Sequence, residues 1–138
     1  MEDNAIRIGE VIEAGTAEFA AQCYELYGLP ALGALVRTAS GDVQIYGVVN
    51  EALTGGVEPG RRPLARGKNA ASEEAVYSEN PQLSRLLRSE FRALVVGCRI
   101  DGTLRHHLPP CPARIHGFVY VCPDAEVREF SKIGRAHV

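Results

Sequence analysis

The sequence predicts a mainly β protein: a small closed antiparallel barrel of about six strands, with a short helical insert at about 71–90 and a C-terminal helix. Three observations lead to this fold class. Short stretches of alternating apolar and polar residues recur along the chain, separated by turns that contain Gly or Pro. Helical patterns occur only in the insert and at the end. No strand–helix–strand alternation is present, so a parallel sheet is not expected.

The first half of the chain is predicted to form two hairpins. Residues 5–16 are rich in β-branched side chains, and Gly9 within them indicates a bulge or a close approach of another backbone. After a turn at 15–16, residues 17–26 alternate with period two, although their composition also allows a helix; we expect a strand. A loop at 27–33 leads to the second hairpin. Its strands are expected at 34–39 and 43–53, with a turn at 40–42.

The second half holds the insert and the closing strands. Residues 54–70 contain four Gly and two Pro and are expected to form a long surface loop. Two short helices should follow: Ser72 is a plausible N-cap for the first, and Asn80 with Pro81 for the second. These two helices are expected at 72–80 and 80–91. Three strands are expected at 91–100, 104–108 and 114–122, and a last helix is expected at 123–131.

Length and composition describe an ordinary single domain. The chain has 138 residues, 46% of them hydrophobic, and a formal net charge of −2, so no strong global attraction to nucleic acid or anionic lipid is expected. No apolar run reaches the ~18 residues that a membrane span needs, and no signal peptide is visible. The four cysteines form no C-x-x-C pair, which favours reduced thiols. We therefore expect a cytoplasmic protein.

The segment 106–122 holds several residues that can bind metals. Its two adjacent histidines, if on a strand, point to opposite faces, so at most one could join a site. A thiolate–imidazole pair between Cys111 and His107 or His116 is conceivable, but nothing in the sequence orients the base. The candidate ligands are His106, His107, Cys111, His116 and Cys122, and their spacing fits no known zinc pattern. We expect neither a metal, nor a cofactor, nor catalytic residues.

The sequence also lacks a nucleotide-binding loop. The nearest text is GRRPLARGKNA, but Gly60 and Gly67 lie seven positions apart rather than five. Lys68 is followed by Asn69, which cannot supply the hydroxyl that holds Mg²⁺. The chain as given is therefore not expected to hydrolyse ATP.

A cluster of basic residues in the long loop is the candidate site. Arg61, Arg62, Arg66 and Lys68 lie within eight residues in an otherwise acidic domain. They could be a solvated loop, or they could contact a phosphate or an acidic partner. Whether they touch DNA is left open.

The last residues are expected to have an unusual origin. Back-translated, residues 133–138, IGRAHV, give ATC GGA AGA GCA CAC GTC, which resembles the start of a common short-read sequencing adapter. We expect residues 132–138 to be an adapter artefact and the domain to be 1–131. Long-read sequencing of the source DNA would test this, because a genuine tail would read IGRAHV followed by a stop.

Several stretches together resemble one known domain. IRIGEVIEAGTAEFAAQC, then LPALGALVRTA, then DVQIYGVVNEA are similar to the HAS barrel, the β-barrel shared by HerA-type ATPases and rotary ATP synthase subunits. The later text, EFRALVVGCRIDGTLRHHLPPCPARIHGFVYVC, resembles the closing strands of HAS-barrel proteins of cyanobacteria and related bacteria. The resemblance covers about residues 5–131.

The resemblance implies a non-catalytic role. In HerA-like DNA-translocating ATPases such a barrel helps subunits assemble into a ring and can dock a partner nuclease, and the ATPase core follows it. We therefore expect self-association or ATPase subunits as partners. The alternative is a free-standing barrel that binds a protein or small ligand. The DNA beyond codon 132 discriminates between them: a Walker A motif favours the first, and an early stop favours the second.

Overall fold

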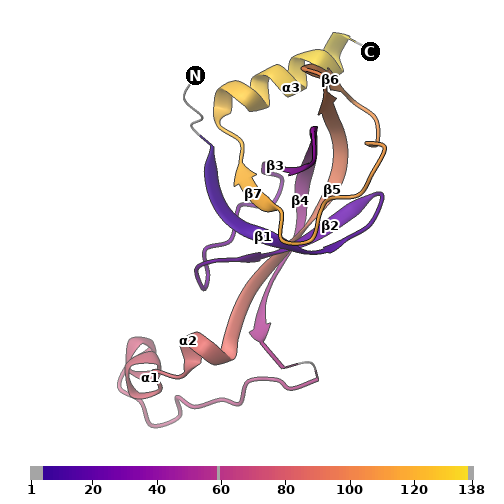
Figure 1. Cartoon of the computed structure of the whole chain (residues 1–138). Coiled ribbons are helices and arrows are strands. Elements are labelled where there is room, and N and C mark those ends of the chain that lie inside the picture. The colour runs from indigo at the N-terminus through magenta and orange to yellow at the C-terminus, as the bar shows by residue number, and fades with distance from the viewer. Residues whose placement is uncertain (1–4, 59, 137–138) are drawn as a thin grey trace.

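The computed structural model describes residues 5–58 and 60–136, with the backbone alone from 133 onward. It shows a barrel with a helix across one end and a two-stranded arm projecting from the other (Figure 1). The elements in chain order are β1 (Ile6–Ala14), β2 (Glu18–Cys23), β3 (Leu35–Ser40), β4 (Val43–Gly56), α1 (Glu73–Glu79), α2 (Leu83–Leu86), β5 (Leu87–Ile100), β6 (Thr103–Arg105), β7 (Phe118–Val121) and α3 (Asp124–Ala136).

The barrel closes through six antiparallel strands. Their order is β2-β1-β7-β3-β4-β5, and pairing of β2 with β5 completes the ring, while β6 adds to the far end of β5. The predicted fold class is thereby confirmed. None of the helices in the described part of the chain is long and apolar enough to cross a membrane.

The inward-facing residues of all six strands fill the barrel interior. Phe19 and Phe91 are its largest members, and both are only 1% exposed. Small residues accommodate the Phe19 ring: a Cβ at Gly47 would lie 2.9 Å from the Ala93 Cβ and 3.1 Å from the Phe19 ring. The buried residues of this cluster are Val11, Phe19, Ala21, Cys23, Val36, Ile45, Val49, Phe91, Ala93, Val95, Ala113 and Val119.

The first hairpin forms as predicted, and Gly9 has both expected roles. The register of β1 against β7 shifts between Arg7 and Gly9, which marks a bulge. A Cβ at Gly9 would overlap the carbonyl oxygen of Gln22 on β2, so only glycine allows this approach.

Helix α3 packs against a second buried cluster, separate from the barrel interior. Phe130 packs at 5.2 Å from the Tyr46 ring and stacks at 4.2 Å on the His106 ring. The Glu126 carboxylate lies 3.0 Å from the Arg37 guanidinium and accepts a 2.7 Å hydrogen bond from the Tyr46 hydroxyl. The helix is therefore fixed by an apolar contact and by partly buried polar contacts together.

The predicted boundaries of the insert were wrong in two places. The expected helix at 80–91 is a single turn, Leu83–Leu86, and strand β5 already begins at Leu87. The expected loop after residue 53 is instead strand until Gly56. The reason is that these two segments pair with each other, Gly56 opposite Leu87, and this ladder outweighs the weak local preferences of both.

The closing strands are shorter than expected, and the last helix is longer. The predicted strands at 104–108 and 114–122 are observed as Thr103–Arg105 and Phe118–Val121. Helix α3 continues past 131 to Ala136. The proposed adapter artefact at 132–138 falls partly on residues 137–138 and on side chains from 133, which lie outside the described residues, so it stays a prediction.

Candidate functional site

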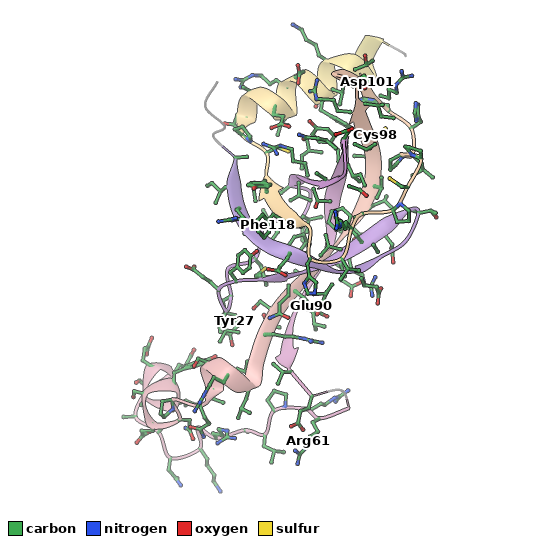
Figure 2. The ribbon with its side chains drawn as sticks, viewed as in Figure 1. Tyr27, Arg61, Glu90, Cys98, Asp101 and Phe118 are labelled. Carbon is green, nitrogen blue, oxygen red and sulfur yellow. The ribbon has the colours of Figure 1, made fainter. Side chains whose placement is uncertain are left out.

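The candidate site lies on the arm. We define the arm as residues 51–56 of β4, the residues of β5 that pair with them, and residues 57–86. The two strands leave the barrel side by side, with Glu90 near the exit and Arg61 at the tip (Figure 2). Two short helices and the basic loop form the tip. In the described part of the tip, Leu83 is the one buried residue.

Side-chain caps hold the tip together. Ser72 is the N-cap of α1, as predicted, and its hydroxyl accepts a 3.1 Å hydrogen bond from the Ala75 amide. Asn80 was predicted to begin the next helix, but it ends α1 instead, donating a 2.7 Å hydrogen bond to the Val76 carbonyl. Its side-chain oxygen also accepts a 3.1 Å hydrogen bond from Arg66. Asn80 therefore ties the basic loop to α1.

An open cleft of about 430 Å³ lies between the basic loop and α2. Leu83 forms part of its wall and is 8% exposed, whereas Leu86 is 42% exposed and Leu64 is 80% exposed. Arginines and leucines thus share one concave surface, whose lining is Gly56, Val57, Glu58, Arg61, Arg62, Pro63, Leu64, Arg66, Leu83, Leu86 and Leu87.

The structure brings three of the four predicted basic residues to this cleft. Arg61 pairs with Glu58 at 3.0 Å, an exposed contact, and Arg66 is held by Asn80. Arg62 also lines the cleft, and no ion pair or hydrogen bond of its side chain occurs within the described residues. Lys68 does not line the cleft. A ligand would therefore meet two positioned guanidinium groups and one available group.

A second hollow of about 230 Å³ adjoins the cleft and shares Leu64 and Arg66 with it. Tyr27 from the barrel and Tyr77 from α1 line this hollow, and their hydroxyl groups form a hydrogen bond of 2.5 Å. The Tyr27 amide also donates to the Ser89 hydroxyl at 2.8 Å. These bonds connect the tip of the arm to the barrel loop before β3.

Sequence reasoning identified the arginines but missed the leucines. Leu83, Leu86 and Leu87 are spaced as a helical stripe, and such a stripe normally packs against a core. Here the helix is one turn long and little covers it, so the stripe stays partly open. Leu64 stands alone in a loop, and no sequence pattern marks it.

The residues considered as metal ligands are not brought together. The His106 ring contacts the Phe130 carbonyl at 2.8 Å, whereas His116 contacts the Glu10 carboxylate at 2.8 Å. No group of three or more potential ligands forms a metal site within the described residues. No hydrogen bond joins Cys111 to a histidine in this part of the chain either.

Glu10 organises a small polar group on the barrel surface. It accepts hydrogen bonds from His116 and, at 3.0 Å, from the Tyr24 hydroxyl. The bond with His116, followed by that with Tyr24, lowers the pKa of Glu10. The group borders an open hollow that Phe118 lines. It fixes an imidazole beside a carboxylate, but no thiol or hydroxyl nucleophile lies within hydrogen-bond reach of the imidazole in the described structure.

Known proteins give no family for this chain. No protein-family model matches it, and a search of curated proteins finds no match. The resemblance to the HAS barrel therefore stays a prediction from the sequence, and the function is argued from the arm.

Proposed function

We propose that the protein is a non-catalytic barrel domain whose arm docks an acidic, partly apolar segment of a partner protein. The observation that carries the proposal is the cleft on the arm, where Arg61, Arg62 and Arg66 border exposed leucines. The barrel serves as a rigid base for the arm, because the inward residues of its six strands form a closed, buried core.

The chemistry of the cleft matches such a segment on two counts. Guanidinium groups bind carboxylates through paired, charge-assisted hydrogen bonds. Leu64 and Leu86 offer apolar area that a leucine or phenylalanine of the partner would cover. Arginine is also one of the residue types enriched among the hot spots of protein interfaces.

A protein segment suits the arm better than a nucleic acid does. The arm carries Glu58 at the cleft and Glu73 and Glu74 at the start of α1, which repel phosphates. A nucleic-acid surface would be more uniformly basic, with aromatic side chains free for stacking. Tyr27 and Tyr77 instead donate and accept hydrogen bonds with each other.

The resemblance to the HAS barrel supports the same kind of role. It would make the protein an assembly and docking module of a HerA-like DNA-translocating ATPase in the cytoplasm, with ATPase subunits or a nuclease as partners. The alternative is a free-standing barrel that binds a protein or small ligand. Both use the arm as a contact surface, and neither requires catalysis by this chain.

The test uses a fluorescent peptide that alternates aspartate or glutamate with leucine. Arg62→Glu should weaken its binding at least tenfold, because it places a carboxylate where the peptide's carboxylates bind. Arg85→Glu makes the same charge change on α2, outside the cleft, and should leave binding within about twofold. Equal weakening by both variants would contradict a specific cleft. Tighter binding of duplex DNA than of the peptide would replace the protein partner with nucleic acid.

A further inference from the structure

A second contact surface lies on the side of β4 that faces away from β5. β3 covers this side only as far as Val48, and hydrogen bonds from the loop before β3 reach Val49. From Glu51 to Gly56, no strand of the described chain pairs with it, and these residues pair with β5 alone. Figure 1 shows the two strands continuing below the barrel without a neighbouring strand.

This edge has little of the protection that exposed strand edges usually carry. Natural proteins block such edges with lysine, proline, a bulge or a covering element, because a free edge can pair with another strand. The stretch from Glu51 to Gly56 contains neither lysine nor proline, and the one register shift lies at its start, between Val49 and Glu51. Leu53, at its centre, is 54% exposed.

We propose that this edge of β4 pairs with the same edge of a second copy of the chain, antiparallel and with Leu53 on the twofold axis. The proposal goes beyond the docking function, since it uses a different surface of the arm. In this register Leu53 faces Leu53, Ala52 faces Thr54, and Glu51 faces Gly55. The dimer would join two ribbons into one four-stranded sheet, which satisfies backbone groups that water satisfies in the single chain.

Charge complementarity selects this register. Glu51, Leu53 and Gly55 share one face of β4, opposite Arg92, Glu90 and Arg88 of β5 respectively. In the dimer, Glu51 therefore points across Gly55 of the second copy toward its Arg88. No two like charges are placed directly opposite each other, and two new Glu51–Arg88 contacts form by symmetry.

Gly55 gains a role that the single chain does not give it. Its backbone is not in the left-handed region, and a Cβ built on it would meet nothing within 4 Å. Neither conformation nor crowding therefore requires glycine there, although glycine weakens a strand. In the dimer, the absence of a side chain leaves the space through which Glu51 reaches Arg88.

The first test measures self-association of the whole protein by sedimentation over a range of concentrations. We expect a monomer–dimer equilibrium whose dissociation constant rises at least tenfold in Leu53→Lys, because two ammonium groups would meet on the axis. Leu64→Lys makes the same change on the exposed tip and should leave the equilibrium within about twofold. A protein that stays monomeric up to its solubility limit would overturn the proposal, as would equal effects of both variants.

The second test fixes the register. In a Cys111→Ser background, Leu53→Cys should form a disulfide between copies under mild oxidation, whereas Leu64→Cys should not. Glu51→Arg and Arg88→Glu should each weaken the dimer, and the double exchange should restore it. Failure of the double exchange would reject this register.

The two tests separate the dimer from docking. Arg62→Glu should weaken peptide binding at least tenfold while leaving the dimer intact, because Arg62 is not on the β4 edge. Loss of both properties in that one variant would contradict the division of the arm into two surfaces.

Discussion

The barrel and the arm are built from the same two strands, yet they differ in how many neighbours those strands have. Within the barrel, β4 lies between β3 and β5, and its inward residues Ile45 and Val49 are at most 1% exposed. On the arm, β4 pairs with β5 alone, and Leu53 is more than half exposed. Burial, and with it stability, therefore depends on strand neighbours more than on the residues themselves. The arm retains apolar surface that is available for contacts.

The sharpest test of this contrast compares an aromatic core residue with an exposed leucine. Phe91→Ala should lower the free energy of unfolding by about 3–5 kcal/mol, because it leaves a cavity in the barrel core. Leu64→Ala, on a residue that is 80% exposed, should change it by less than about 0.5 kcal/mol. Urea unfolding followed by circular dichroism measures both. Comparable losses in the two variants would show that the arm is part of the folded core.

Ion pairs extend the comparison. Glu126→Ala removes the acceptor of Tyr46 and one partner of Arg37, whose side chain is only 11% exposed, and should cost about 1.5–3 kcal/mol. Glu58→Ala removes the exposed pair with Arg61 on the arm and should cost at most about 1 kcal/mol. Thermal unfolding of both variants at low and high salt measures this. A larger loss of stability in Glu58→Ala than in Glu126→Ala would contradict this expected difference between the two ion pairs.

The two regions should also raise the pKa of a tyrosine for different reasons, because at Tyr77 on the arm the hydrogen bond with Tyr27 is the largest cause. Burial, more than any other cause, raises the pKa of Tyr46 from 10 to about 12. The fold holds this phenol neutral, so its contribution to stability is complete below pH 10 and is lost as the pH rises toward 12. Ultraviolet difference spectra should show a late-titrating tyrosine that disappears in Tyr46→Phe. It should persist in Tyr77→Phe on the arm, and its loss there instead would contradict the assignment.

The smallest effect is expected from removing the tip altogether. Replacing residues 57–86 by Asn-Gly joins Gly56 to Leu87, which already face each other, through a two-residue turn. Since the tip buries little, the free energy of unfolding should change by less than about 1 kcal/mol. Calorimetry of the excised protein measures this. A barrel that no longer folds would show that the tip is required for the barrel.

The barrel was largely predictable from the sequence because alternation reveals a half-buried strand. Gly9 indicated a bulge or a close approach of another backbone, and the structure shows both. The closing contacts, β1 with β7 and β2 with β5, were not predictable, since pairing between distant strands leaves no local pattern. The packing of α3 on Tyr46 had one indication in the sequence. The face of β4 that carries Tyr46 lies opposite a face that is also apolar, and a strand with apolar residues on both faces is expected to be covered on both.

The arm was only partly predictable. The cluster of basic residues was visible in the sequence, and three of the four line the cleft. The arm ends of β4 and β5 were not visible in the sequence, because residues 54–56 have the composition of a loop and Leu87 continues a helical spacing. Their mutual pairing decided the outcome, and it places Gly56 and Leu87 together in the lining of the cleft.

The lengths of β4 and β5 have a mechanical consequence. Each strand has 14 residues, or about 45 Å of continuous backbone, and runs from the arm to the wall beneath α3. No loop interrupts β4 between Tyr46 and Gly56, although its register against β5 shifts next to Gly47 and next to Glu51. The arm is thus a stiff extension of the barrel rather than a flexible linker. A force applied at the tip of the arm is therefore transmitted along the backbones of β4 and β5 to the part of the sheet on which α3 packs.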